Sequence, residues 1–223
     1  MLILGIDDAG RGPLIGPMVL AGVLIPEELE AEFKQQGIKD SKMLTPKNRE
    51  HLAQNIKTQS LKYEIMQVEP EDIDTSLTTG TNLNDVEAIE CAKIINKLNS
   101  GKEKIKVIID CPSTNIKSWI EYVKTCVINK ENLEIIGEHK ADVNHPCVSA
   151  ASILAKTHRD AEIEKLKKKL GVDFGSGYPS DPLTCKFLKE YGKKHEHDGI
   201  FRKTWSTWKT ACSSKKQKKL GEF

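Results

Sequence analysis

The chain has 223 residues, of which 38% are hydrophobic and 30% are charged, and its formal net charge at pH 7 is only +2. This length suits one large domain, or a domain with an appendage, and is enough to bury a substantial core. No apolar run approaches the roughly 20 residues that cross a bilayer, and the first residues read as a strand rather than a signal peptide. We therefore expect a soluble, cytoplasmic protein.

The cysteines and lysines narrow the class of protein further. Six cysteines occur without a Cys-x-x-Cys pair or zinc-type spacing, which is typical of reduced cytosolic thiols. The net charge does not indicate a nucleic-acid partner, but lysines gather at 165–169, 186–194 and 215–219 and could form a basic face. For 165–169 an ordinary solvated helix face is the better interpretation.

Over the first 140 residues the hydrophobic pattern predicts alternating strands and helices. Thr45 and Pro46 form a typical helix start, with a capping side chain followed by proline at the first helical position. In chain order we predict a strand over 2–7, a strand over 17–25, helices over 26–36 and 46–58, a strand over 61–68, a helix from Asn82 or Asn84 to Lys97, a strand over 105–110, a helix over 115–125 and a strand over 132–137.

In the rest of the chain, the sequence pattern predicts helical segments before and after one loop. Residues 142–170 form a long helical segment whose small residues, from Ser149 to Ala155, allow close packing, and Asp142 lies at its N-terminus. Residues 171–182 are rich in Gly, Pro, Ser and Asp and predict a loop. We divide the chain into a main domain over 1–172, a small helical appendage with this loop over 173–212, and a basic tail over 213–223 that has too little apolar content to fold alone.

Two of the predicted strands end in acidic residues. The first leads into Asp7 and Asp8 and then into Gly10-Arg11-Gly12, while the strand over 105–110 ends in Asp110. Ligands of α/β sheets collect where strands end, so Asp7 and Asp110 converge if their strands are parallel neighbours. Oxygen ligands without His or Cys favour Mg²⁺ or Mn²⁺ over Zn²⁺. The pattern indicates metal-assisted phosphate chemistry, although an acid also ends many strands and caps many helices without any metal.

A series of short motifs, in a fixed order, makes this interpretation specific. The chain resembles the type 2 ribonuclease H family (ribonuclease HII), in its archaeal and eukaryotic catalytic-subunit form, over nearly its whole length. The motifs that carry the resemblance are Ile6–Pro13, Lys39–Lys42, Thr81–Asn84, Ile108–Asp110, Lys140–Asp142, Ser149–Lys156, Arg159–Asp160, Gly175–Pro182 and Arg202–Trp205.

The resemblance implies an α/β fold, with a ribonuclease H-like mixed sheet flanked by helices and a small C-terminal helical appendage. Asp7, Asp8, Asp110 and Asp142 match the family's catalytic tetrad of carboxylates, which holds two divalent cations, Mg²⁺ or Mn²⁺. The second position is usually Glu, so Asp8 is one methylene shorter than the family's pattern. The implied enzyme cleaves the RNA strand of RNA–DNA hybrids, and the phosphodiester 5′ of a single ribonucleotide embedded in duplex DNA, leaving 3′-hydroxyl and 5′-phosphate ends. Such activity serves DNA replication and ribonucleotide excision repair.

The resemblance also implies how the substrate is read. The glycine-flanked turn matches the one that the family places against the ribose 2′-OH, the group that distinguishes RNA from DNA. A tyrosine packs on the sugar at an RNA-to-DNA junction, and a second segment contacts backbone phosphates. Lys156 and Arg159 add either phosphate contacts or surface ion pairs. The implied substrate-binding residues are Gly10, Arg11, Gly12, Asp40, Ser41, Lys42 and Tyr178.

The last residues suggest a protein partner. Gln217, Leu220 and Phe223 have the spacing of a sliding-clamp-binding peptide, with one aromatic residue in place of the usual pair. Such peptides fold on binding, while flanking lysines steer the approach. The alternative is a disordered basic tail that raises affinity for nucleic acid. The resemblance to archaeal members implies a single-chain monomer.

Two other functions fit the same residues. One is another metal-dependent nuclease on the same fold, of the junction-resolvase type, which would act on junctions made only of DNA. The other is a non-catalytic module that binds hybrids, which the shorter acid at Asp8 makes conceivable.

Overall fold

The computed structural model describes residues 1–38 and 44–217, with side chains described as far as residue 211. Tertiary contacts divide the chain into two compact units. The first comprises residues 1–9, 19–67 and 83–158, and the second comprises residues 10–18, 68–82 and 159 onward. The division at 172 and 212 expected from the sequence stays a prediction.

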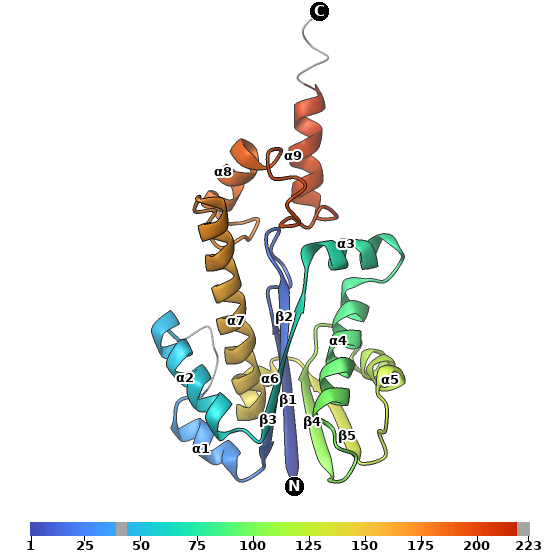
Figure 1. Cartoon of the computed structure of the whole chain (residues 1–223). Helices are drawn as coiled ribbons and strands as arrows, with labels where there is room; N and C mark the ends of the chain where they lie inside the picture. Colours follow the sequence, from blue (N-terminus) through green and yellow to red (C-terminus); the bar gives the residue numbers. More distant parts are fainter. Residues whose placement is uncertain (39–43, 218–223) are drawn as a thin grey trace, which may run out of the picture. The chain divides into compact units, whose positions relative to one another are not determined.

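A mixed five-stranded sheet forms the centre of the first unit (Figure 1). Strand β1 pairs with β2 in the antiparallel sense and with β4 in the parallel sense, and β4 pairs in parallel with β5. The strand order is β3-β2-β1-β4-β5. The strands are β1 (Leu2–Ala9), β2 (Met18–Pro26), β3 (Lys62–Val68), β4 (Ile105–Asp110) and β5 (Leu133–Glu138).

Helices cover both faces of this sheet, which explains why β2, and β1 as far as Ile6, are continuously apolar. Along β2, Val19, Ala21 and Val23 share a core with residues of α1, α2 and the start of α7. Gly22 faces the other way, and a Cβ there would lie 2.3 Å from Ile94 on α4. In Figure 1, α1, α2 and α7 lie on one side of the sheet and α4 and α5 on the other.

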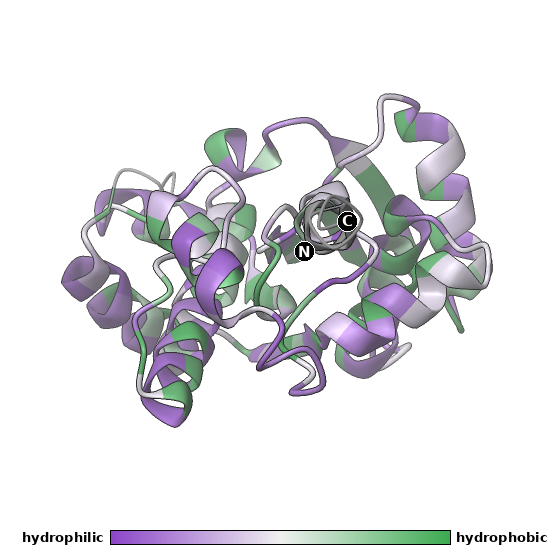
Figure 2. Ribbon diagram, turned by 90° about the horizontal axis from the view of Figure 1, so that it is seen from above, coloured by the Kyte–Doolittle hydropathy of each residue, from purple (hydrophilic) through white to green (hydrophobic). Residues whose placement is uncertain are grey.

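The helices follow the expected start signals. Thr45 Oγ1 accepts the amide hydrogen of Asn48 at 3.3 Å, as a capping side chain does, and Asn115 caps α5 in the same way. Hydrophilic and hydrophobic residues alternate along the helices (Figure 2). The helices are α1 (Leu29–Gln35), α2 (Pro46–Gln59), α3 (Pro70–Thr78), α4 (Leu83–Leu98), α5 (Ile116–Cys126), α6 (Ala141–Asn144), α7 (Pro146–Leu170), α8 (Pro182–Tyr191) and α9 (Ser206–Gln217).

Three features differ from the sequence prediction. Helix α3 was not predicted, although Pro70 at its first position and Glu71 and Asp72 in its first turn are start signals. The helical segment after Asp142 is interrupted at His145, which is extended because it precedes Pro146. Helix α9 continues through Gln217, five residues into the segment predicted as a tail.

The second unit has its own core, built around aromatic residues of its C-terminal part. Phe174, Phe187, Phe201 and Trp208 are buried there together with Ile15 from the segment after β1. An isolated β-bridge joins Ile15 to Phe201. Within residues 1–38 and 44–217, no helix is long and apolar enough to cross a membrane.

Candidate active site

The carboxylates at the ends of β1 and β4 are brought together by the parallel pairing of these strands. Ile6 of β1 is in register with Ile109 of β4, so Asp7 and Asp110 follow paired residues at the same edge of the sheet. Asp7, Asp8 and Asp110 line one small pocket. The condition set for their convergence, that the two strands are parallel neighbours, is therefore met.

Asp7 is the electrostatic centre of this pocket, because it is only 6% exposed and has two acidic neighbours. Burial raises its pKa well above the usual value, and the negative charges of Asp8 and Asp110 raise it further. Hydrogen bonds from the Ser152 side chain and from the Asp8 amide, the latter at 2.7 Å, oppose this rise without cancelling it. Among the described residues that line the pocket none carries a positive charge, which a bound cation would supply.

The helix that carries Asp142 is connected to Asp110 by a hydrogen bond from its main chain. Asp142 is 5% exposed and lies on the short helix α6, where the preceding residue, Ala141, donates its amide hydrogen to Asp110 Oδ1 at 2.9 Å. The hydroxyl of Ser149 on α7 donates to the Asp142 carbonyl oxygen. These two contacts fasten the helix that carries Asp142 to the end of β4 and to α7.

Glu87 is a residue that the sequence analysis missed. It is 2% exposed, lies on α4 and lines the same pocket as the three carboxylates of β1 and β4. The sequence does carry a signal for it, because Glu87, Cys91 and Ile94 lie on one helix face, and Cys91 and Ile94 are apolar. Burial raises the pKa of the Cys91 thiol, and the negative charges of Glu87, Asp8 and Asp7 add to this effect, so the thiol stays protonated.

The chemistry of these donors fits a hard divalent cation. Several carboxylates meet at one pocket, one of them deeply buried, and oxygen donors of this kind suit Mg²⁺ or Mn²⁺. Among the side chains of residues 1–38 and 44–211, no three His, Cys, Asp or Glu residues stand in a ready-made ligand shell. The fit to a metal thus rests on donor type, burial and charge.

A glycine-rich turn follows β1 and belongs to the second unit. Gly10 and Gly16 have φ of +86° and +85°, which side chains rarely adopt, and a Cβ on Gly10 would lie 2.2 Å from Arg159 Nε. A Cβ on Gly12 would lie 3.6 Å from Tyr178 Cε1. The turn and the tyrosine, which the sequence assigns to sugar recognition, therefore lie together.

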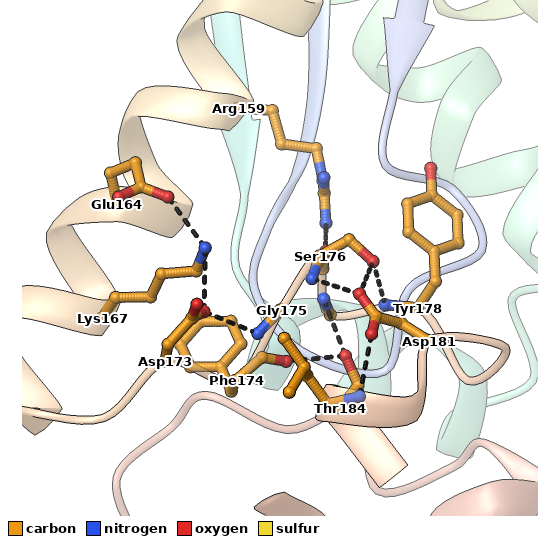
Figure 3. Close-up of polar contacts among 12 residues, drawn as sticks. Arg159, Glu164, Lys167, Asp173, Phe174, Gly175, Ser176, Tyr178, Asp181 and Thr184 are labelled. Atoms are coloured by element: carbon orange, nitrogen blue, oxygen red, sulfur yellow. Dashed lines mark hydrogen bonds and ion pairs between the residues drawn. The ribbon is translucent and has the colours of Figure 1, made fainter. Parts of the chain in front are cut away.

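The loop that carries Tyr178 is held rigidly by polar contacts (Figure 3). Asp181 accepts hydrogen bonds from the Ser176 amide at 2.8 Å and from its hydroxyl at 2.7 Å. The buried Thr184 hydroxyl accepts from the Gly177 amide at 3.0 Å and donates to the Phe174 carbonyl at 2.8 Å. Tyr178 itself remains 36% exposed. A fixed loop thus presents an accessible aromatic ring.

Comparison with known proteins identifies the family. A family model described as ribonuclease HII matches residues 4–208. The ribonuclease HII of Methanocaldococcus jannaschii is 46% identical to this chain over 99% of both sequences. The ribonuclease HII of Pyrococcus furiosus is 44% identical over 98% of this chain and 95% of the relative. The chain belongs to the ribonuclease HII family.

Solved structures of ribonucleases HII share the fold. The ribonuclease H2 of Pyrococcus horikoshii has a TM-score of 0.85 and 40% identity, covering 95% of this chain and 97% of that one. The ribonuclease HII of Archaeoglobus fulgidus, solved in complex with PCNA, has a TM-score of 0.81 and 36% identity, covering 92% and 96%. The predicted ribonuclease H-like fold is confirmed. The chain is an endonuclease of the ribonuclease H type, and enzymes of this family depend on divalent metal ions.

Arg159 has neither of the two roles that the sequence left open for it, a phosphate contact or a surface ion pair. It is 1% exposed, so it forms no surface ion pair and offers no open phosphate contact. Its Nη2 donates to the Ser176 carbonyl at 3.2 Å, and its guanidinium carbon lies 5.4 Å from the centre of the Tyr178 ring. Burial lowers the pKa of Arg159. Arg159 is therefore a buried residue that stabilises the Tyr178 loop through the Ser176 carbonyl and the Tyr178 ring.

Other predicted residues fall into two groups. Lysines of the 165–169 run pair with acids of the same helix, Lys165 with Glu162 at 2.6 Å and Lys167 with Glu164 at 2.9 Å, as a solvated helix face does. Gln217 ends α9, but its side chain lies outside the described residues. The remaining predicted site residues that fall outside the described residues are Asp40, Ser41, Lys42, Leu220 and Phe223.

Proposed function

We propose that this protein cleaves the RNA strand of RNA–DNA hybrids, and the phosphodiester 5′ of a single ribonucleotide in duplex DNA, with two Mg²⁺ or Mn²⁺ ions. The products would carry 3′-hydroxyl and 5′-phosphate ends. The observation that supports this most directly is the meeting of Asp7, Asp8 and Asp110 at one pocket, where two parallel strands end. The family assignment supports the same reaction.

In this proposal the carboxylates divide the work of holding the cations. Asp7, which is only 6% exposed and has Asp8 and Asp110 as neighbours, would ligate both, while Asp110 and Asp142 would each ligate one and Asp8 would complete the set. When bound, the cations supply an activated water and neutralise charge on the leaving oxygen. The hydrogen bond from the Ala141 amide N–H engages Asp110 Oδ1 and orients the other carboxylate oxygen.

Three labelled duplexes of one sequence test the reaction: all DNA, DNA with one ribonucleotide, and full RNA–DNA hybrid. We expect cleavage of the second and third, and none of the first. Cleavage of DNA-only junctions would instead indicate a resolvase, and tight binding of the hybrid without cleavage in either metal would indicate a binding module. Mapping the cut to the 3′ side of the ribonucleotide would contradict the proposed product.

We also propose that the turn at Gly10, Arg11 and Gly12 reads the ribose 2′-OH while Tyr178 packs on the adjoining sugar. The short distance between Gly12 and the tyrosine ring supports this, because one nucleotide can meet both. Asp40, Ser41 and Lys42 would contact backbone phosphates. Amides of a glycine-rich turn approach a ligand closely, which suits recognition of a single hydroxyl.

A further part of the proposal concerns the C-terminal residues Gln217, Leu220 and Phe223, which we assign to sliding-clamp binding. The Archaeoglobus fulgidus ribonuclease HII, solved in complex with PCNA, supports this assignment. Leu220→Ala combined with Phe223→Ala should remove most of the affinity for the clamp, since a few buried anchors dominate such interfaces. A matched variant keeps both anchors and replaces Lys215, Lys216, Lys218 and Lys219. Loss of binding only in this second variant would mean that the tail is an electrostatic arm.

A further inference from the structure

Arg202 is a charged side chain that the reaction as described leaves unused, although it is completely buried, with 0% exposure. It lies in the second unit, as does the glycine-rich turn at residues 10–16. Its Nη2 donates to the carbonyl oxygen of Gly10 at 2.6 Å and its Nη1 to that of Arg11 at 2.7 Å. Nε and Nη2 both donate to the Gly16 carbonyl, at 3.2 and 3.0 Å.

Trp205 binds the next carbonyl of the turn. Its Nε1 donates to the Gly12 carbonyl at 3.1 Å, and its ring centre lies 5.1 Å from the guanidinium carbon of Arg202. The carbonyls of Gly10, Arg11 and Gly12 are therefore all held by one segment that lies about 190 residues later in the chain. Burying a cation costs free energy unless its donors are well partnered. The planar fork of arginine places donors on three separate nitrogens in a fixed geometry, whereas a lysine has all its donors on one nitrogen.

The hydrogen bonds from Arg202 to these carbonyls also fix the direction of the neighbouring N–H groups. The peptide bonds are trans and planar, so the carbonyl of one residue and the N–H of the next point in opposite directions. With the Gly10 and Arg11 carbonyls turned toward Arg202, the N–H groups of Arg11 and Gly12 point away from it. The next residue, Pro13, has no N–H. The turn therefore directs two specific donors to the side opposite Arg202.

We infer that Arg202 and Trp205 are positioning residues for ribonucleotide discrimination. Arg202 holds the Gly10 and Arg11 carbonyls and thereby directs the N–H groups of Arg11 and Gly12 at the ribose 2′-OH, while Trp205 anchors Gly12 on the same side, so that the donors need no reorganisation on binding. This inference rests on the proposed role of the turn in reading the ribose. It assigns the sugar preference to a buried arginine and a tryptophan that do not touch substrate.

The test measures sugar discrimination apart from stability. Dissociation constants are determined in EDTA, at fixed salt, for an all-DNA duplex and for the same duplex with one ribonucleotide, and their ratio is the readout. Trp205→Phe keeps an aromatic ring but removes the donor to Gly12. We expect the ratio to fall about three- to tenfold, the scale of one lost hydrogen bond. Arg202→Lys, whose donors all lie on one nitrogen instead of the three that Arg202 uses, should reduce it more than tenfold.

Trp208→Phe is the matched control. Trp208 is 6% exposed, lies three residues from Trp205 and packs on Phe201 with ring centres 4.6 Å apart. It should lower the melting temperature and leave the ratio unchanged. Ratios equal to that of the native chain in folded Trp205→Phe would overturn the inference, whether or not Arg202→Lys folds. A native ratio near one would instead overturn the proposed reading of the ribose, and the inference with it.

Discussion

At the scale of single residues, the carboxylates of the pocket favour binding of a cation at the cost of stability. Asp7 is buried next to Asp8 and Asp110, and both burial and these negative charges raise its pKa. Natural proteins accept such local instability where function needs it. Variants at Asp7 should therefore move activity and stability in opposite directions.

Asp7→Asn should reduce cleavage by at least about 100-fold while leaving hybrid binding largely intact, because it removes the central ligand and no phosphate contact. In EDTA at neutral pH the variant should also be more stable than the native chain. The folded-state pKa of Asp7 lies above the unfolded value of 3.8, so native stability falls as pH rises through the folded pKa. A gain of about 1 kcal/mol would raise the melting temperature by roughly 2–4 °C.

The pH dependence provides the control for this prediction. The difference in melting temperature between variant and native chain should vanish below pH 3.8, where Asp7 is protonated in both states, and grow as pH rises. Undiminished cleavage, or a melting-temperature difference that is the same at every pH, would contradict the assignment.

Asp8→Glu should give activity in Mg²⁺ equal to or above that of the native chain, since it restores the length usual in the family. Asp8 is partly exposed at the end of β1, so one more methylene has room. Steady-state cleavage of a duplex with one ribonucleotide measures the effect, and Asp8→Asn is the matched variant that should lose activity. A severe loss in Asp8→Glu would show that the neighbouring backbone has adapted to the shorter acid.

At the scale of elements, the loop after α7 shows how local contacts prepare an exposed side chain for binding. Asp181 and Thr184 accept hydrogen bonds from main-chain amides of the loop, and the guanidinium of Arg159 lies over the Tyr178 ring. The ring therefore loses little freedom when a sugar packs on it. This arrangement predicts that the ring, more than its hydroxyl, carries the contribution of Tyr178.

Tyr178→Ala should impair cleavage at one embedded ribonucleotide about tenfold more than cleavage of continuous hybrid, because only the first depends on reading a single sugar junction. Tyr178→Phe, which keeps the ring, should stay within about threefold of the native chain on both substrates. The ratio of kcat/KM on the two duplexes measures this. Equal losses on both substrates in Tyr178→Ala would reduce Tyr178 to a packing residue.

At the scale of the whole molecule, the two compact units hold different parts of the proposed chemistry. Asp7, Asp8, Asp110 and Asp142 belong to the first unit, whereas the glycine-rich turn and Tyr178 belong to the second. A ligand of the carboxylates should therefore stabilise the chain through the first unit.

Mn²⁺ should raise the melting temperature of the native chain. At a concentration 100 times the dissociation constant the gain is about 2.7 kcal/mol, or roughly 5–10 °C for a chain of this size. The rise in Asp7→Asn should be less than half as large, because its central ligand is lost. Equal rises in both proteins, measured by thermal unfolding with and without Mn²⁺, would place metal binding elsewhere in the chain.

The sequence by itself determined the elements and much of the chemistry. Apolar runs, the capping residue Thr45 and the proline at position 46 predicted most strands and helices, because these signals act over a few residues. The ordered motifs indicated the family and its four carboxylates. The Gly, Pro and Ser content of 171–182 likewise predicted the loop that carries Tyr178.

Tertiary structure alone decided which distant residues meet. Parallel pairing of β1 with β4 brings Asp7 close to Asp110, and α4 places Glu87 in the same pocket. In the sequence, the only signal for Glu87 is that an acidic residue lies on an apolar helix face. The sequence left Arg159 open as a phosphate contact or a surface ion pair and indicated Arg202 only as part of a motif. Both are buried and donate to carbonyls many residues away. Burial and the partners of a charge depend on contacts between segments far apart in the chain, which no local pattern records.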